Sequence, residues 1–144
     1  MHLDYRLNED RETDWSSVTE EDLRYRVALG NLIFHAGDKD FSAAWDWIPL
    51  IDLAASLQEI VRKLEGGSIS ETFEFTESDA WIRFEKKDGK VLVSTSYGDG
   101  VGEIPLSALT EAIKSFRERL HAELVRKHPH AAHNAAVRKL LGAR

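Results

Sequence analysis

Two segments of the chain repeat apolar residues every three or four positions, which is the spacing of an amphipathic helix. The first predicted helix runs from about Pro49 to Leu64, because proline suits a first helical turn and Gly66-Gly67 ends the helix. The second runs from about Ser107 to Lys127 and ends at His128-Pro129, because the residue before a proline avoids helical angles. From these helices and the strands below we expect four side chains in the core: Leu57, Phe84, Phe116 and Leu120.

Between the two helices, apolar and polar residues alternate with the period of half-buried strands. The alternation covers three runs, Ile69 to Phe75, Ala80 to Glu85 and Val91 to Tyr97. Asp88-Gly89 predicts a tight hairpin turn between the second and third runs. Val101 to Ile104 predicts a short last strand.

The first third of the chain has a less regular pattern. Residues 23–29 alternate, Gly30-Asn31 interrupts, and residues 32–34 resume, which predicts either two strands joined by a tight turn or one strand with a bulge. His2 to Leu7 predicts an edge strand. Asn8 to Asp22 predicts a loop, which carries seven acidic residues against one arginine.

The C-terminal residues, His130 to Arg144, have a weak apolar stripe and predict a short third helix. No repeat and no linker divides the chain, so we expect residues 1–144 to form a single domain, with an acidic loop at 8–22 and a basic C-terminal helical tail at 129–144. The predicted fold class is α+β: an antiparallel sheet of about five or six strands with the two long helices packed on one face, plus a short C-terminal helix.

Composition excludes several classes of protein. A chain of 144 residues without cysteine can bury a core, but it has no disulfide framework, no thiol nucleophile and no cysteine metal site. No apolar run approaches the roughly 20 residues that a membrane helix needs. Met1 to Tyr5 lacks the basic flank and the apolar stretch of a signal peptide. We therefore expect a soluble, cytoplasmic protein.

The net charge of −6 is unevenly distributed along the chain. From Lys114 onward, eight basic residues accompany two acidic ones, a net charge of +6, so the preceding residues carry −12. An acidic body repels nucleic acid and attracts basic protein surfaces. The basic segment has four interpretations: a solvated helix face, neutralisation of the body within the chain, neutralisation across a homodimer, or contact with nucleic acid.

Few residue groups have the spacing of a catalytic or metal site. His128, His130 and His133 lie close together and could ligate a metal ion, but no carboxylate lies within the cluster, and the alternative is a solvent-facing polar stretch. Gly98 to Gly102 is rich in glycine, yet no helix begins at its third glycine, so it predicts a turn rather than a phosphate loop. No nucleophilic-serine motif is present. We expect no enzymatic activity, no cofactor and no bound metal.

The chain has four tryptophans: Trp15, Trp45, Trp47 and Trp81. One interpretation is that they complete the core. The other is an interface, because Trp45 and Trp47 face the same way on an extended segment and have acidic residues nearby, as at a docking surface for a basic partner. On this second interpretation, the partner-binding residues are Trp45, Asp46, Trp47, Asp38, Asp40, Trp15, Glu12 and Asp14.

The order of the predicted elements resembles a recurrent bacterial design. Between Leu23 and Lys127 the chain has a strand pair, a tryptophan-rich segment, a helix begun by proline, a three-strand meander and a second long helix. Trp47-Ile48-Pro49-Leu50 precedes the first helix, and Glu103-Ile104-Pro105-Leu106 precedes the second. This arrangement resembles small α+β proteins found among the immunity proteins of bacterial toxin systems. The resemblance implies a binding protein that neutralises a partner enzyme, although the basic C-terminal segment departs from it.

The leading hypothesis is a non-enzymatic protein-binding module, an immunity protein that neutralises a cognate bacterial toxin through an acidic, Trp-containing surface. Its expected partner is a basic protein; no membrane partner is expected, and nucleic acid is disfavoured. The first alternative is a small-ligand-binding or enzymatic domain with a pocket between sheet and helices, where His35, Tyr97 or buried carboxylates converge. The second alternative is a nucleic-acid-associated protein that uses the basic C-terminal segment.

Overall fold

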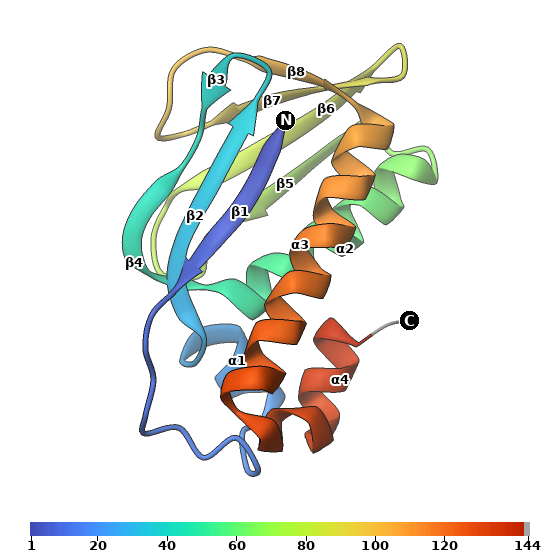
Figure 1. Cartoon of the computed structure of the whole chain (residues 1–144). Helices are drawn as coiled ribbons and strands as arrows, with labels where there is room; N and C mark the ends of the chain where they lie inside the picture. Colours follow the sequence, from blue (N-terminus) through green and yellow to red (C-terminus); the bar gives the residue numbers. More distant parts are fainter. Residues whose placement is uncertain (143–144) are drawn as a thin grey trace.

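The computed structural model describes residues 1–142, which form two four-stranded antiparallel sheets and a set of helices (Figure 1). Sheet A contains β1 (His2–Leu7), β2 (Leu29–Ala36), β3 (Lys39–Asp40) and β4 (Ala43–Pro49). Sheet B contains, in spatial order, β5 (Ser70–Glu74), β6 (Trp81–Lys87), β7 (Lys90–Thr95) and β8 (Gly102–Pro105). The helices are α1 (Glu20–Tyr25), α2 (Leu50–Glu65), α3 (Leu106–Lys127), the short 3-10 helix η1 (Pro129–His133) and α4 (Ala135–Leu141).

The α+β class and the antiparallel pairing are as predicted, but the single sheet of five or six strands is wrong. In sheet A, β2 pairs with β1 and also with β3 and β4, so its two edges are already occupied. From the end of β4 the chain enters α2, whose 16 residues span about 24 Å. The strands that follow α2 therefore pair with one another in a second sheet.

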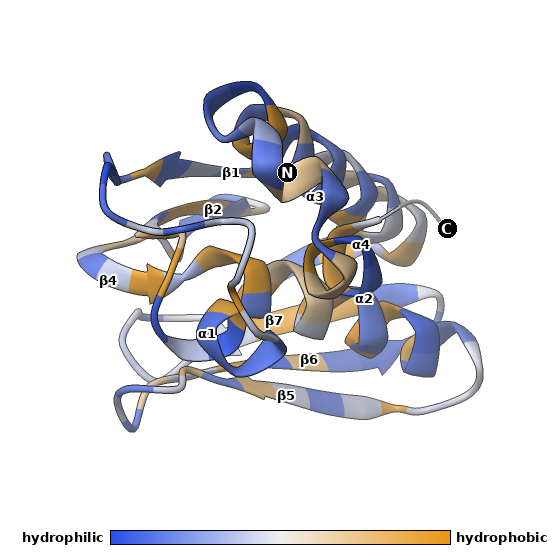
Figure 2. Ribbon diagram, turned by 90° about the horizontal axis from the view of Figure 1, so that it is seen from below, coloured by the Kyte–Doolittle hydropathy of each residue, from blue (hydrophilic) through white to orange (hydrophobic). Residues whose placement is uncertain are grey.

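The two long helices do not cover one face of a single sheet, because each of them contacts both sheets. Figure 2 shows the sheets one above the other, with α2, α3 and α4 along one side. Helix α2 packs against β2 and β4 of sheet A and against β5 of sheet B, while α3 packs against β1 and β8. The helices also pack on each other, so together they connect the two sheets.

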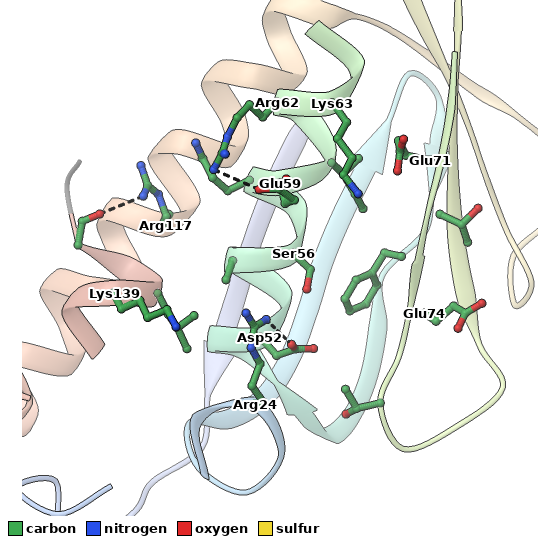
Figure 3. Close-up of a pocket in the computed structure, with 18 residues that line it drawn as sticks. Arg24, Asp52, Ser56, Glu59, Arg62, Lys63, Glu71, Glu74, Arg117 and Lys139 are labelled. Carbon is green, nitrogen blue, oxygen red and sulfur yellow. Dashed lines mark hydrogen bonds and ion pairs between the residues drawn. The ribbon is translucent and has the colours of Figure 1, made fainter. Parts of the chain in front are cut away.

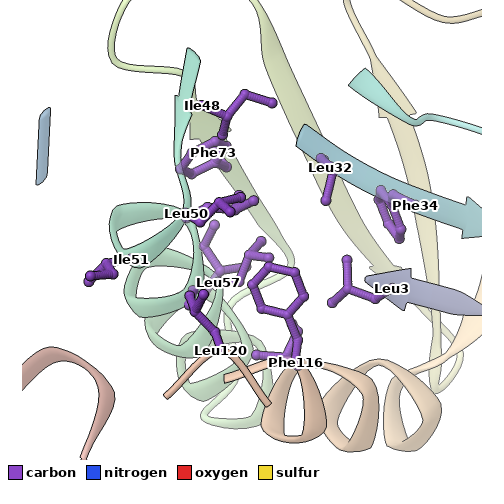
Figure 4. Close-up of a cluster of buried hydrophobic side chains, with 14 of the residues drawn as sticks. Leu3, Leu32, Phe34, Ile48, Leu50, Ile51, Leu57, Phe73, Phe116 and Leu120 are labelled. Carbon is purple, nitrogen blue, oxygen red and sulfur yellow. The ribbon is translucent and has the colours of Figure 1, made fainter. Parts of the chain in front are cut away.

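The core lies where these helices meet the two sheets (Figure 4). It draws Leu32 and Phe34 from sheet A and Phe73 from sheet B, against the apolar stripes of α2 and α3. All four residues expected in the core are at most 3% exposed: Leu57, Phe84, Phe116 and Leu120. The helical periodicity therefore identified the buried faces of both long helices correctly.

Both long helices begin within one residue of the predicted positions, but the predicted alternation over 23–29 is wrong in its first part. Residues 20–25 form helix α1 instead. The Asp22 amide donates to Oγ1 of Thr19 at 3.1 Å, and the Thr19 amide donates to the Asp22 carboxylate at 3.0 Å. This reciprocal capping box, together with three acidic residues in the first turn, stabilises a helix start.

The structure has no tight turn at Gly30-Asn31, and the strand that passes through these residues begins only at Leu29. Residues 29–36 form one strand, β2, and its pairing with β4 is irregular at this point. The hairpin turn at Asp88-Gly89 is confirmed, since both residues have positive φ, as a two-residue turn between β6 and β7 requires. The predicted last strand is confirmed as β8.

A close approach of two backbones joins sheet B to sheet A. A Cβ atom at Gly102 of β8 would lie 2.3 Å from the carbonyl oxygen of Ala36, at the end of β2. No residue with a side chain fits this contact, because such a distance is far inside van der Waals separation. Gly102 therefore allows β8 to lie directly against the β2–β3 hairpin.

The acidic loop and the basic C-terminal tail are packed against each other within the chain. The Asn134 side chain, 8% exposed, donates to the carbonyls of Trp15 and Val18 at 3.2 and 2.9 Å and also caps the start of α4. Lys139 pairs with Glu20 of α1 at 2.8 Å. Of the four interpretations of the basic segment, neutralisation within the chain therefore applies at least to Lys139. Arg144, part of the same prediction, lies outside the described residues.

Among the described residues, none of the helices combines the length and the apolar character that crossing a membrane requires.

The packing predicts a large difference between two substitutions on the same helix. Phe116→Ala removes a fully buried ring from α3 and should lower the free energy of unfolding by about 3–5 kcal/mol. Glu111→Ala, at an exposed position of α3, should change it by less than about 0.5 kcal/mol. Denaturant titrations of both variants measure these values, and similar losses for both would contradict the described packing.

Candidate functional site

A bulge in β4 builds the principal candidate site. Gly30 of β2 pairs with Ile48, and Leu32 pairs with Ala43, so the four residues 44–47 lie opposite the single residue Asn31. A bulge re-aims the side chains of its strand, and bulges are frequent beside functional sites. Here the re-aimed segment contains Trp45, Asp46 and Trp47.

Hydrogen bonds from two asparagines fix the backbone of this bulge. The Asp46 amide donates to Oδ1 of Asn31 at 2.7 Å, and Nδ2 of Asn31 donates to Oδ1 of Asp46 at 2.9 Å. Nδ2 of Asn8 donates to the Asp46 carbonyl at 2.6 Å. Asp46 has a φ of 70°, in the left-handed region that aspartate tolerates better than most residues with a side chain. The neighbouring side chains thus hold the turn in a conformation that a regular strand excludes.

Trp45 and Trp47 project from the bulge as a stacked pair. Their ring centroids are 5.3 Å apart and their planes differ by 17°. Trp45 also meets Phe75 and Tyr97 edge to face, at 5.1 and 4.9 Å. Such aromatic pairs each contribute about 0.5–1.5 kcal/mol beyond burial. Because Phe75 follows β5 and Tyr97 follows β7, the cluster also joins sheet A to sheet B.

We call Trp45, Trp47 and Tyr97 the aromatic face, because these three rings of the cluster remain partly exposed while Phe75 is buried. Beside it lies a shallow pocket of about 510 Å³, lined by Trp45, Trp47, Ser78, Asp79, Ala80 and Ser96. The pocket combines indole rings, two hydroxyls and one exposed carboxylate. This chemistry suits a cationic side chain, which can lie over a ring and pair with the carboxylate.

Asp40 borders the aromatic face at the Tyr97 end. The Tyr97 hydroxyl donates to the carbonyl of Phe41 at 2.7 Å, and burial raises its pKa well above the ordinary value, with the charge of Asp40 adding to the shift. Tyr97 therefore stays a protonated donor. The side-chain hydroxyl and the amide of Ser42 lower the pKa of Asp40, which stays a carboxylate. Asp38 is exposed in the turn between β2 and β3.

The residues predicted from the acidic loop do not join this surface. Trp15 is 3% exposed and stacks on His128 with ring centroids 5.1 Å apart, so its ring does not lie on the surface of the described chain. Its ring is buried because it fills the space between the loop and the C-terminal segment. Glu12 and Asp14 are exposed on the same loop, and Asp14 accepts hydrogen bonds from Ser16.

A second, larger hollow of about 890 Å³ lies over helix α2, with β5 on one side and α3 and α4 on the other (Figure 3). The first alternative expected a pocket between sheet and helices, and this cleft occupies such a position. Neither His35 nor Tyr97 lines it. A buried carboxylate does line it, namely Asp52 of α2, which is 7% exposed.

Asp52 is paired with a cation from another helix. Nη1 of Arg24, on α1, donates to Oδ1 of Asp52 at 2.7 Å. Burial raises the pKa of Asp52 above its ordinary value, while Arg24 and the Ser56 hydroxyl partly offset the rise. The pair links α1 to the start of α2 at the floor of the cleft.

The three histidines near the C-terminus do not converge on a metal position. His128 stacks on Trp15, and His130 and His133 lie in η1. Within residues 1–142 no group of three histidine, aspartate or glutamate side chains is arranged to hold a metal ion.

Sequence reasoning did not bring together the residues that pack against the tryptophan pair and those that line the two hollows. Phe75 entered only as the end of an alternating strand, and Tyr97 was expected in a pocket between sheet and helices rather than beside the tryptophans. Asp79 was not singled out. Asp52 offered a signal, because it lies in the run Leu50–Ala54, where the other four residues are apolar. A carboxylate there needs a buried partner, but which cation supplies it depends on the tertiary fold.

Comparison of this chain with protein-family models, curated proteins and solved structures found no significant match.

The raised pKa of Asp52 predicts a pH-dependent difference in stability. The folded state binds this proton more tightly than the unfolded state, so the stability of the native chain relative to Asp52→Asn should fall as pH rises from about 3.8 through the raised pKa, and then level off. Urea titrations of both proteins between about pH 3 and pH 7 measure the difference. A difference that grows with pH would contradict the assigned environment of Asp52.

Proposed function

We propose that this protein is a non-enzymatic protein-binding module that docks on a basic partner through the aromatic face. The observation that carries the proposal is the stacked pair Trp45 and Trp47, which is partly exposed and held in place by the Asn31-bound bulge. The proposal keeps three of the predicted contacts, Trp45, Asp46 and Trp47, and places Asp40 at the border.

The geometry supports binding because these rings are fixed before a partner arrives. Exposed tryptophan and tyrosine are enriched among residues that dominate interface energies. Trp45 is wedged between Trp47, Phe75 and Tyr97, so little side-chain freedom remains to be lost on association. A rigid aromatic surface is thus more favourable for docking than the same rings on a mobile loop.

The carboxylates near the aromatic face support a basic partner. Asp46 and Asp79 are exposed at the bulge and the shallow pocket, and Asp40 lies beyond Tyr97. Complementary charge steers association and selects among partners. We expect a lysine or arginine of the partner to enter the pocket, lie over an indole ring and pair with Asp79.

The resemblance to immunity proteins indicates which partner to test first. An inhibitor of this kind binds a toxin enzyme of the same cell, so a basic protein encoded in the adjacent reading frame is the first partner to test. Many toxin substrates are polyanions, and enzymes that bind polyanions carry the positive surface that this face would complement.

Binding to that basic protein should depend on Trp47 and Asp79. After co-purification, isothermal titration calorimetry should give a dissociation constant that Trp47→Ala raises at least about 30-fold, equivalent to about 2 kcal/mol. Asp79→Asn should weaken binding less and reduce its salt dependence.

The matched control is Ile69→Ala with Glu85→Ala, which alters one exposed apolar and one exposed acidic residue at the other end of sheet B. These changes should leave the dissociation constant within about two-fold. Equal effects of Trp47→Ala and the control, or failure of the two proteins to associate, would contradict the proposal.

A further inference from the structure

The cleft over α2 has two rims of opposite charge. Arg117 of α3 and Lys139 of α4 lie on one side, and Glu71 and Glu74 of β5 lie on the other (Figure 3). Helix α2 forms the floor between them. None of the residues that line this cleft lines the pocket beside the aromatic face, so the two sites are separate.

Two ion pairs lie along the floor of the cleft. Arg24 binds Asp52 at 2.7 Å, and Arg62 binds Glu59 at 3.1 Å. Within each pair, the two opposite charges neutralise each other. The charges that set the selectivity of the cleft are therefore those of its rims, together with Lys63 of α2.

The rims do not neutralise each other. In the part of the chain that the structure describes, no ion pair joins β5 to α3 or α4 across the cleft. Lys139 pairs instead with Glu20, which does not line the cleft, and Glu71 accepts a hydrogen bond from Ser68. Glu74 makes no ion pair with the described residues. The cleft thus keeps opposite charges apart with space between them.

Each side of the cleft also has a buried polar atom without a partner among residues 1–142. These atoms are Nε of Arg117 on α3 and Oγ1 of Thr76, which follows β5. Nη1 of Arg117 donates to the carbonyl of Gly142 at 3.1 Å, which fixes the guanidinium while leaving Nε free. Buried polar groups are nearly always hydrogen-bonded, so each wall of the cleft carries one polar side chain whose hydrogen bonding is incomplete within residues 1–142.

We propose that this cleft binds a small zwitterionic molecule, with its anionic group against Arg117 and Lys139 and its ammonium group against Glu71 and Glu74. A simple anion is repelled by the β5 rim, and a simple cation is repelled by the helical rim. Lys63 of α2 also lines the cleft without an ion pair among the described residues, and Figure 3 shows it between α2 and Glu71, toward the β5 side.

A short peptide has the right size and polarity. The cleft volume of about 890 Å³ is within the range of small-molecule sites. An extended tripeptide spans about 10 Å, comparable with the edge of a cube of that volume. Its uncharged middle would face Ala55, Ile60 and Leu140, which contribute the apolar part of the lining.

The experiment compares three probes that differ only in their terminal charges. Trialanine carries both charges, N-acetyl-trialanine only the carboxylate, and trialanine amide only the ammonium group. Titrated into the ¹⁵N-labelled full chain, trialanine should shift amide resonances of α2 and β5. It should bind at least about five-fold more tightly than either singly charged form, the ratio expected for one partly exposed ion pair.

Two substitutions test which rim binds which terminal charge of the peptide. Glu74→Gln should weaken binding of trialanine and of its amide but not of the N-acetyl form, whereas Lys139→Gln should weaken trialanine and the N-acetyl form only. Glu85→Gln, an exposed position of β6 outside the cleft, is the matched control and should change nothing.

Equal affinities of the three peptides, or no shift of cleft resonances at about 20 mM trialanine, would overturn the proposal. So would equal effects of Glu74→Gln and Glu85→Gln. The amide spectrum of each variant shows directly whether it has folded. Because the aromatic face does not take part, the outcome is independent of the protein-binding proposal.

Discussion

The bulge opposite Asn31 is the constraint on which the arrangement of this molecule depends. Ala43 and Ile48 both keep their pairing with β2, so the four residues between them must leave the sheet. Because these residues leave the sheet, Trp45 and Trp47 pack against Phe75 and the neighbouring rings of sheet B. The same local feature therefore joins the two sheets and forms the surface to which we assign partner binding.

Helix α2 connects this feature to the second site. It begins at Leu50, directly after β4, and turns one face toward the core and the other toward the polar cleft. Leu53 and Leu57 pack inward, while Glu59 and Arg62 line the cleft. The buried pair of Asp52 with Arg24 fixes the first turn of α2 to α1. Each surface is thus supported by an element that the core holds in place.

The sequence predicted those parts of the fold that depend on local pattern. Apolar periodicity located α2 and α3, and Asp88-Gly89 located a hairpin. The sequence did not predict two sheets, because the alternation of apolar and polar residues within one strand does not determine which other strand pairs with it. Helix α1 was missed because the capping box at Thr19 outweighs the alternation that follows. For the site, Trp45 and Trp47 were identified, but Phe75, Tyr97 and the Arg24–Asp52 pair depend on contacts between distant segments.

The aromatic face is already formed in the free protein, before any partner binds. Nuclear Overhauser measurements on the unbound chain test it most directly, because they detect ring protons a few ångströms apart. We expect strong cross-peaks from the Trp45 indole to the rings of Tyr97 and Phe75, whose centroids lie 4.9 and 5.1 Å away. Absence of these cross-peaks, with the Trp45 and Trp47 signals at the shifts of an unstructured peptide, would contradict it.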